Sequence, residues 1–465
     1  MRKGIAIVLW VAIVAIVAGD IVAIQTIDAD DPPAAWDPRV RPLVSFVESK
    51  RHLRFEHPVP VEFLGKEEFE KTQKTDESDL SKDEQRDIRV FEGQARALGL
   101  ISSDTRLLDD LNAITTGGTL AFYDPSDKKI VIRGTALTVG LRVTIAHELT
   151  HALQDQAFDL EREFDTDGAD SFFHALAEGD ATRIENEYVD SLSDSQQDEY
   201  FEESDSSGEA AKDALRDVAP ALLQFFGAPY ALGEQVTTLI VAEKGVKALD
   251  KLFRTPPDSD EGLVDAFAAL DDERALKVRA PKLRAGEKRN DSGDFGVVPW
   301  YVVLASFIDE RSALNAVDGW GGDSYVGYKK ADRSCIRIAF RGDTPADANE
   351  MAAALNQWKA AFTENTVQVT MTKQGVELDA CEPTVVPTPR AGAAEALTLP
   401  VTRLALLGQV LSEGAERKLA ECLSRNFVAQ VRLDALDGAT EAEQQYLFDL
   451  VTQLGRACAN GRLGA

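Results

Sequence analysis

Hydrophobic positions recur with helical spacing in two neighbouring stretches of the first half of the chain. Residues 138–156, TVGLRVTIAHELTHALQDQ, are apolar on several sides, which is typical of a helix buried inside a domain. Residues 170–188, DSFFHALAEGDATRIENEY, also have helical spacing. Residues 119–134 place β-branched and aromatic runs on either side of the turn sequence DPSD, and this pattern predicts a β-hairpin.

The remaining pattern predicts a mixture of helices and strands. A strand is expected at 58–64 and an amphipathic helix at 89–101. Residues 214–285 look helical, with breaks at Pro220, Pro229 and Pro256-Pro257. Further on, a helix (297–308), a short strand (335–340), a helix through Trp358 and a strand (367–381) follow. The expected fold class is α+β, with a largely helical second half and a small C-terminal helical appendage.

The first helix contains His147-Glu148-Leu149-Thr150-His151, an H-E-x-x-H sequence. Two histidines four residues apart lie on one face of a helix, so both imidazoles can reach one Zn²⁺. Glu148 lies beside that face, where a carboxylate can take the proton of a water on the metal. The chain has only five histidines, and two of them fall in this motif. The spacing predicts a zinc site of the peptidase kind.

A catalytic zinc usually has three protein ligands and one open position. Ala157 stands where a third histidine of the H-E-x-x-H-x-x-G-x-x-H pattern would be. Glu178, set among small apolar residues of the second helix, is the favoured third ligand, because such a setting disfavours a solvated charge. His174 lies one turn earlier on the same face. It is a candidate for a supporting contact, a substrate contact, or the ligand itself.

HELTHALQDQ at 147–156, followed by ALAEGDAT at 175–182, resembles the gluzincin group of zinc metallopeptidases, which includes thermolysin-like enzymes. The resemblance implies a zincin-like catalytic domain that binds one Zn²⁺ per chain through His147, His151 and Glu178. It implies Glu148 as the general base. It also implies that Asp155, one turn after His151, supports a ligand histidine and fixes its tautomer.

This resemblance covers roughly residues 117–190 and is weak elsewhere. The distance in sequence from His151 to Glu178 exceeds that of thermolysin, so a segment is inserted between the two helices. In gluzincins, a strand ahead of the active helix holds an extended substrate by backbone pairing. The hairpin at 119–134 is expected to take that place, or to be an ordinary structural hairpin.

These enzymes usually add a tyrosine or histidine that donates a hydrogen bond to the developing oxyanion. Tyr230, Tyr325 and His174 are the candidates, and the sequence does not rank them. Tyr325 follows Gly-Trp-Gly-Gly-Asp-Ser, where glycines permit close backbone approach to a ligand, although a tight structural turn fits the same residues better.

The N-terminus combines Arg2 and Lys3 with an apolar run from Ile5 to Ala18 that continues to Ile24. Without a good cleavage site, this segment favours a membrane anchor over a cleaved signal, with the bulk of the chain outside the cytoplasm. The chain is therefore expected to be extracytoplasmic, either N-terminally membrane-anchored or secreted.

The cysteine positions fit the same compartment. Four cysteines in the last third favour two disulfides over four buried thiols. Closeness in sequence favours the pairs Cys335–Cys381 and Cys422–Cys458.

The charge excludes one class of partner. The net charge of −29, from 79 acidic and 50 basic residues, argues against nucleic acid, because binding to phosphates needs a basic face. Part of this charge is concentrated at 190–213, an acidic, Ser-rich stretch that predicts a solvated loop.

The expected organisation has five parts. An N-terminal anchor or signal (1–27) precedes a stalk (28–57), a zinc metallopeptidase-like domain (58–382), a Pro/Ala linker (383–399) and a small helical domain (400–465). The leading hypothesis is zinc-dependent hydrolysis of peptide bonds in a protein or peptide substrate. The rival is a non-catalytic extracytoplasmic binding or scaffold protein, in which a side chain such as His174 closes the fourth position of a structural zinc.

Overall fold

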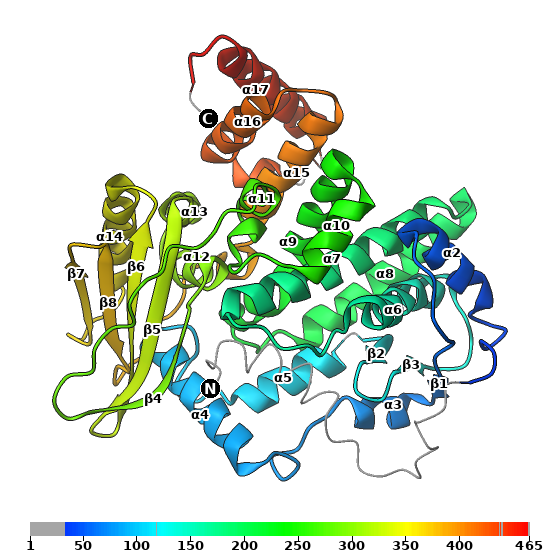
Figure 1. Ribbon diagram of the computed structural model, residues 1–465, viewed down its shortest axis with the longest axis horizontal. Helices are drawn as coiled ribbons and strands as arrows, with labels where there is room; N and C mark the ends of the chain where they lie inside the picture. The colour runs from blue at the N-terminus through cyan, green and yellow to red at the C-terminus, as the bar shows by residue number, and fades with distance from the viewer. Residues whose placement is uncertain (1–32, 118, 437, 439, 464–465) are drawn as a thin grey trace.

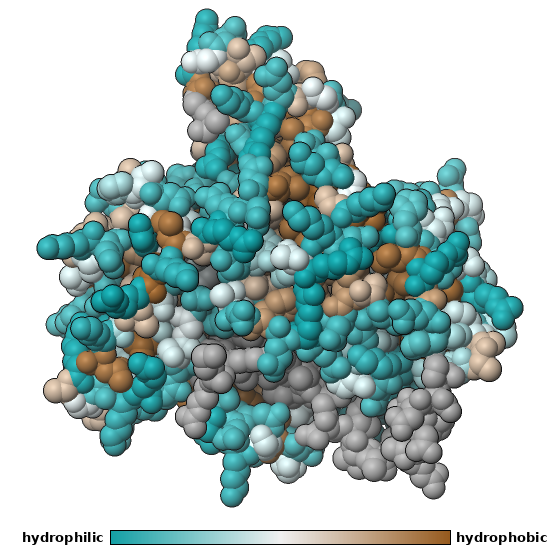
Figure 2. Space-filling model, in the orientation of Figure 1, coloured by the Kyte–Doolittle hydropathy of each residue, from teal (hydrophilic) through white to brown (hydrophobic). Residues whose placement is uncertain are grey.

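A computed structural model describes residues 33–463 except 118, 437 and 439. The chain forms an α+β structure in which two separate sheets flank a central group of helices (Figure 1). The expected N-terminal anchor or signal, residues 1–27, lies outside the described residues. Hydrophilic side chains cover most of the face shown in Figure 2, as the large negative charge requires.

The first sheet has the strand order β1-β3-β2, with β1 parallel and β2 antiparallel to β3. Its strands are β1 (Val61–Leu64), β2 (Ala121–Asp124) and β3 (Lys129–Arg133). The predicted hairpin at 119–134 and the strand at 58–64 are thus confirmed. Because β2 is paired on one side only, its other edge is free to face the helices that follow.

The central helices are α6 (Val139–Phe158), α7 (Asp167–Asp190) and α9 (Pro220–Lys244). The hydroxyls of Thr138 and Thr166 cap α6 and α7, so both N-termini are fixed by local hydrogen bonds. The helices α7 and α9 cross at glycines: a Cβ on Gly179 would overlap the backbone of Gly233, and a Cβ on Gly233 would overlap the Ala175 carbonyl. Glycine is therefore required here to let two helix backbones touch.

The second sheet has the order β4-β5-β6-β8-β7, with every neighbouring pair antiparallel. Its strands are β4 (Glu287–Gly293), β5 (Trp320–Lys330), β6 (Arg333–Gly342), β7 (Val367–Met371) and β8 (Val376–Cys381). Cys335 and Cys381 are direct partners in the β6–β8 register and form a disulfide. The single strand expected at 367–381 is wrong in detail, because Gly375 lies in a turn that divides it into β7 and β8.

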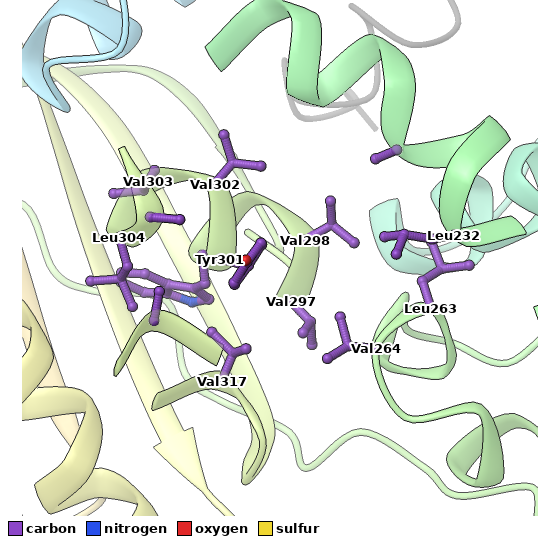
Figure 3. Close-up of a cluster of buried hydrophobic side chains, with 14 of the residues drawn as sticks. Leu232, Leu263, Val264, Val297, Val298, Tyr301, Val302, Val303, Leu304 and Val317 are labelled. Atoms are coloured by element: carbon purple, nitrogen blue, oxygen red, sulfur yellow. The ribbon is translucent and has the colours of Figure 1, made fainter. Parts of the chain in front are cut away.

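Helices pack on this sheet and join it to the centre. They are α12 (Val297–Ala305), α13 (Glu310–Val317) and α14 (Pro345–Lys359). Figure 3 shows how α12 meets the central helices: Val297 and Val298 face Leu232 of α9 and Leu263 of the short helix η1 (Glu261–Leu263). One apolar core therefore runs from α7 and α9 into the second sheet.

The C-terminal helices are α15 (Thr398–Ser412), α16 (Arg417–Gln430) and α17 (Glu441–Ala459), and they project from the rest of the molecule in Figure 1. A Cys422–Cys458 disulfide joins α16 to α17, so both predicted pairings are confirmed. Among the described helices, Ala393–Ser412 alone has the length and composition of a membrane span. Its buried residues pack against α9 and α16, which a core helix would also do.

Peripheral helices complete the fold. They are α2 (Arg41–Arg51), α3 (Lys66–Thr72), α4 (Lys82–Ala97), α5 (Leu107–Thr116), α8 (Asp194–Ala214), α10 (Val246–Arg254) and α11 (Ala266–Leu270), with 3-10 turns η2 (Ala393–Glu395) and η3 (Leu433–Ala435).

Three sequence expectations are corrected here. The stalk expected at 28–57 does not hold over α2, whose buried face (Leu43, Val44 and Val47) packs on α6. The loop expected at 190–213 is the helix α8, which has no buried residue and is fixed by a capping box at Ser193. Pro229 does not break α9, because the helix is held by its packing against α7 and α15.

The glycine crossing yields a first prediction. Gly179→Ala is expected to lower the free energy of unfolding by about 1–3 kcal/mol, as overpacking does, despite the higher helix propensity of alanine. Chemical denaturation measures this change. The matched control is Gly208→Ala in α8, where a Cβ meets nothing within 4 Å and stability should rise by about 0.5–1 kcal/mol. Equal effects of the two substitutions would contradict the assigned role of the crossing.

Candidate metal centre

His147, His151 and Glu178 come together between α6 and α7. The two histidines are one turn apart on α6, and Glu178 faces them from α7. The Nε2 atoms of the histidines are 3.0 Å apart, and Glu178 Oε2 lies 3.4 Å from His147 Nε2 and 3.3 Å from His151 Nε2. Ligands about 2.1 Å from a tetrahedral zinc lie about 3.4 Å from one another, so this triangle has the size of a zinc site.

The histidine tautomers also fit a metal. His147 Nδ1 lies 3.0 Å from Glu185 Oε2, and His151 Nδ1 lies 3.0 Å from Gln154 Oε1. These oxygens are acceptors, so each Nδ1 carries the proton and each Nε2 directs its lone pair at Glu178. Glu178 Oε2 itself is buried and faces the two Nε2 atoms. With a metal bound, the donor set would be two neutral imidazoles and one carboxylate aimed at one point.

A buried network of charges holds this arrangement. The Gln154 side chain donates to Ala177 O (3.1 Å) and to Asp180 Oδ2 (3.0 Å). Asp180 is fully buried and pairs with Arg51 Nε at 2.6 Å and with Arg183 Nη2 at 2.9 Å. Arg51 belongs to α2 and is also fully buried. The orientation of His151 thus depends on a chain of contacts that begins in the segment expected to be a stalk.

Glu148 points toward the edge of the first sheet. Its Oε2 accepts a hydrogen bond of 2.7 Å from the backbone N–H of Tyr123 in β2. Burial raises the pKa of Glu148, and the neighbouring charges of His147 and His151 oppose this rise. A carboxylate with a raised pKa, held between the two histidines and a free strand edge, is suited to accept a proton and then to release it.

The pKa values of the three converging side chains reflect their mutual attraction. Burial alone would raise the pKa of Glu178, but the charges and hydrogen bonds of His151 and His147 outweigh burial and lower it. Burial alone would lower the pKa of His147, but hydrogen bonds to Glu178 and Glu185 raise it well above its usual value. A strong positive charge is favoured at this point, whether it comes from protons or from a metal ion.

Tyr230 reaches the same site from α9. Its ring stacks on His147 with centroids 6.4 Å apart and an interplanar angle of 19°. The negative charge of Glu178 and then burial raise the pKa of the Tyr230 hydroxyl, which therefore lies near that carboxylate. Tyr230 remains 48% exposed, so it borders solvent as well as the converging side chains. Of the three candidate oxyanion donors, Tyr230 is the one that the structure brings to His147 and Glu178.

The other candidates lie elsewhere. Asp155 accepts a hydrogen bond from the Tyr123 hydroxyl at 2.6 Å and pairs with Lys128. The prediction that Asp155 contacts a ligand histidine is therefore wrong. His174 directs Nδ1 at Asp170 O of its own helix and is not among the converging donors. Tyr325 lies in β5 and donates to Asp291 at the wall of a separate apolar cavity of about 70 Å³.

Sequence reasoning missed the residues that hold the two histidines. Glu185 follows Glu178 by seven residues, two turns along the same face of α7, and Gln154 follows His151 by three on α6. Both positions could have been found from helical spacing alone. Arg51 and Asp180 carry no such signal, since they meet only when α2 packs on the central helices.

Comparison with known protein families gives a match over only part of the chain. Residues 282–397 match the model of a domain of unknown function, DUF8575, and this range contains the second sheet but none of the converging histidines. No curated protein and no solved structure matches the chain. The site must therefore be interpreted from its own chemistry.

The contact between His147 and Glu185 yields a second prediction. Glu185→Ala should weaken Zn²⁺ binding about 10–100-fold, the usual effect of removing the group that orients a ligand histidine. Competition of the purified protein with a chromophoric zinc chelator measures the affinity. Asp190→Ala, an exposed change at the end of the same helix, is the control and should leave affinity unchanged. Unaltered zinc affinity in Glu185→Ala would show that the 3.0 Å contact does not orient His147.

Proposed function

We propose that the protein is an extracytoplasmic zinc metallopeptidase of the gluzincin type. The observation that carries this proposal is the convergence of His147, His151 and Glu178 with the Glu148 carboxylate beside them, at the free edge of β2. This arrangement joins a three-ligand zinc site to a proton acceptor and to an edge strand that can pair with an extended peptide.

The residues divide the chemistry among them. Zinc, when bound, would polarise the scissile carbonyl and make a water more acidic. Glu148 would accept a proton from the attacking water and deliver it to the amide nitrogen as the C–N bond breaks. Tyr230, whose ring stacks on His147, would donate a hydrogen bond from its hydroxyl to the oxygen that gains negative charge. The proton that passes from the water to the leaving amine is thus carried by Glu148.

What supports catalysis over a structural zinc is the composition of the cluster. Among the described residues, this cluster offers three ligand atoms to a metal, one each from His147, His151 and Glu178. His174, which could have closed the fourth position, is directed at Asp170 instead. Three protein ligands and an open position are the usual arrangement of a catalytic zinc.

The compartment agrees with this proposal. Two disulfides within the chain are typical of an oxidising, extracytoplasmic environment. The basic and apolar N-terminal sequence, residues 1–27, supports attachment to a membrane or secretion across it. We propose that the catalytic half is delivered to the outer side, where its substrates are proteins or peptides.

A third prediction tests Glu148 directly. Glu148→Gln should lower kcat by about 10²–10⁴-fold, because the amide cannot accept the water's proton. The assay is release of fluorescent peptides from labelled casein by the zinc-loaded full chain. The zinc content of the variant is the control and should equal that of the wild type, since Glu148 is not a ligand. Full activity in a zinc-loaded Glu148→Gln protein would overturn the proposed mechanism.

A fourth prediction concerns Tyr230. Tyr230→Phe should lower kcat by about 10²–10³-fold with little change in KM, because the lost hydrogen bond acts mainly on the transition state. Steady-state kinetics on a peptide cut from casein by the wild type measure both constants. Tyr446→Phe in α17 is the control, because the Tyr446 hydroxyl bonds to Gln430 and Arg432. A change confined to KM would instead assign Tyr230 to substrate binding.

A further inference from the structure

A second group of acidic side chains lies far from the histidines in sequence. Carboxylate oxygens of Glu261, Glu273 and Asp343 all lie within 4.8 Å of one another. The three residues come from separate segments: Glu261 begins η1, Glu273 follows α11, and Asp343 follows β6. Three like charges so close together repel one another strongly unless a cation lies among them.

Backbone contacts force these segments together. Leu276 N donates to Gly321 O at 2.6 Å, which holds the segment after Glu273 against the start of β5. Gly322 has a φ of +159°, and a Cβ there would overlap the carbonyl of Leu276. Asp343 N donates to Gly319 O in the same region. The glycines of the GWGG sequence therefore serve a close approach of two backbones, and the carboxylates meet as a consequence.

Glu261 is the member that most needs a partner. Its side chain is 8% exposed, and within the described residues its carboxylate has no hydrogen bond and no ion pair. Its neighbour Asp260 differs, since Asp260 accepts hydrogen bonds from Val297 N and Val298 N at the start of α12. Burial, then the charges of Glu273 and Asp343, raise the pKa of Glu261 to about 9.

The nearby arginines are already paired with other acids. Arg425 pairs with Asp265 and Asp318, and Arg417 pairs with Asp271 and Glu421. In the described part of the chain, neither a lysine nor an arginine pairs with the three clustered carboxylates. If the three carboxylates are ionised together, the neutralising charge therefore comes from outside the described side chains.

We propose that Glu261, Glu273 and Asp343 form a calcium site. An all-oxygen donor set selects hard cations, and carboxylates with water in the remaining positions suit Ca²⁺. Glu273 and Asp343 are exposed, so water can complete the coordination. Mg²⁺ demands stricter geometry and gives up its water reluctantly, which disfavours it here. Outside the cytoplasm, sites with dissociation constants of about 10⁻⁴–10⁻³ M are useful to a protein.

The ion would connect two parts of the molecule. Asp343 lies within the matched range 282–397, whereas Glu261 and Glu273 precede it. Next to Glu261, Leu263 and Val264 pack toward Leu232 of α9 and Val297 of α12 (Figure 3). The same helix α9 carries Tyr230. Calcium would thus fasten the second sheet to the helices that build the zinc site, through residues separate from the zinc ligands.

The test is a calorimetric titration of the zinc-loaded full chain with Ca²⁺ in about 150 mM salt, where weak surface binding is screened. The wild type should bind one Ca²⁺ per chain and gain thermal stability. Glu261→Gln should weaken this binding at least about tenfold and abolish the calcium-dependent rise in Tm, because it removes the buried anionic ligand. Glu350→Gln, an exposed acid on α14, is the control and should behave as the wild type.

Each result bears on the site. Absence of calcium binding to the wild type, or equal binding to Glu261→Gln and the wild type, would overturn the proposal. If Glu261→Gln does not fold, Asp343→Asn replaces it, since that position is exposed. His147→Ala should lose zinc and keep calcium, so failure of the proposed zinc chemistry would be distinguishable from failure of the calcium site.

Discussion

The close crossing of α7 and α9 is the contact on which the candidate metal centre depends. Gly179 and Gly233 let the two helix backbones touch, and the side chains beside them are then fixed in place. Glu178 immediately precedes Gly179, and Tyr230 lies one turn before Gly233. A side chain at the crossing would move the Glu178 carboxylate and Tyr230 apart. Helix packing distance, rather than local flexibility, therefore sets the geometry of the site.

Burial of charge is the second constraint. Asp180 and Arg51 are fully buried, and desolvating two such ions costs several kcal/mol unless their hydrogen bonds are well satisfied. This ion pair also helps to orient His151, because Asp180 accepts a hydrogen bond from Gln154 and Gln154 accepts one from His151. The Asp180–Arg51 pair therefore stabilises one orientation of the His151 ring. A hydrophobic replacement would leave that imidazole free to rotate.

The sequence predicted those features of the site and fold that depend on neighbours along the chain. The H-E-x-x-H face, the Glu178 helix, the hairpin and both disulfides follow from local spacing, and the structure has all of them. The acidic stretch 190–213 was mistaken for a loop, because charge and serine content conceal its capping box and helical spacing. The packing of helix α2 could not be predicted, because the burial of Arg51 depends on its pairing with Asp180, which is more than a hundred residues away in sequence. The glycines before Tyr325 have the structural role that the sequence favoured, but the backbone that they approach, Leu276, is distant in sequence and could not be predicted.

A chain with a net charge of −29 contains many carboxylates, and the structure stabilises the buried ones in several ways. Asp180 is paired with arginines, and Asp260 accepts the first N–H groups of α12. Asp323 accepts two backbone N–H groups and the indole N–H groups of Trp300 and Trp320, although burial still raises its pKa to about 7. Glu178 faces two imidazoles. Glu261 has none of these solutions, and a divalent cation is the remaining one that leaves its charge intact. The same physical demand thus explains both proposed metal sites: a buried carboxylate persists only where a positive charge or an ordered donor meets it.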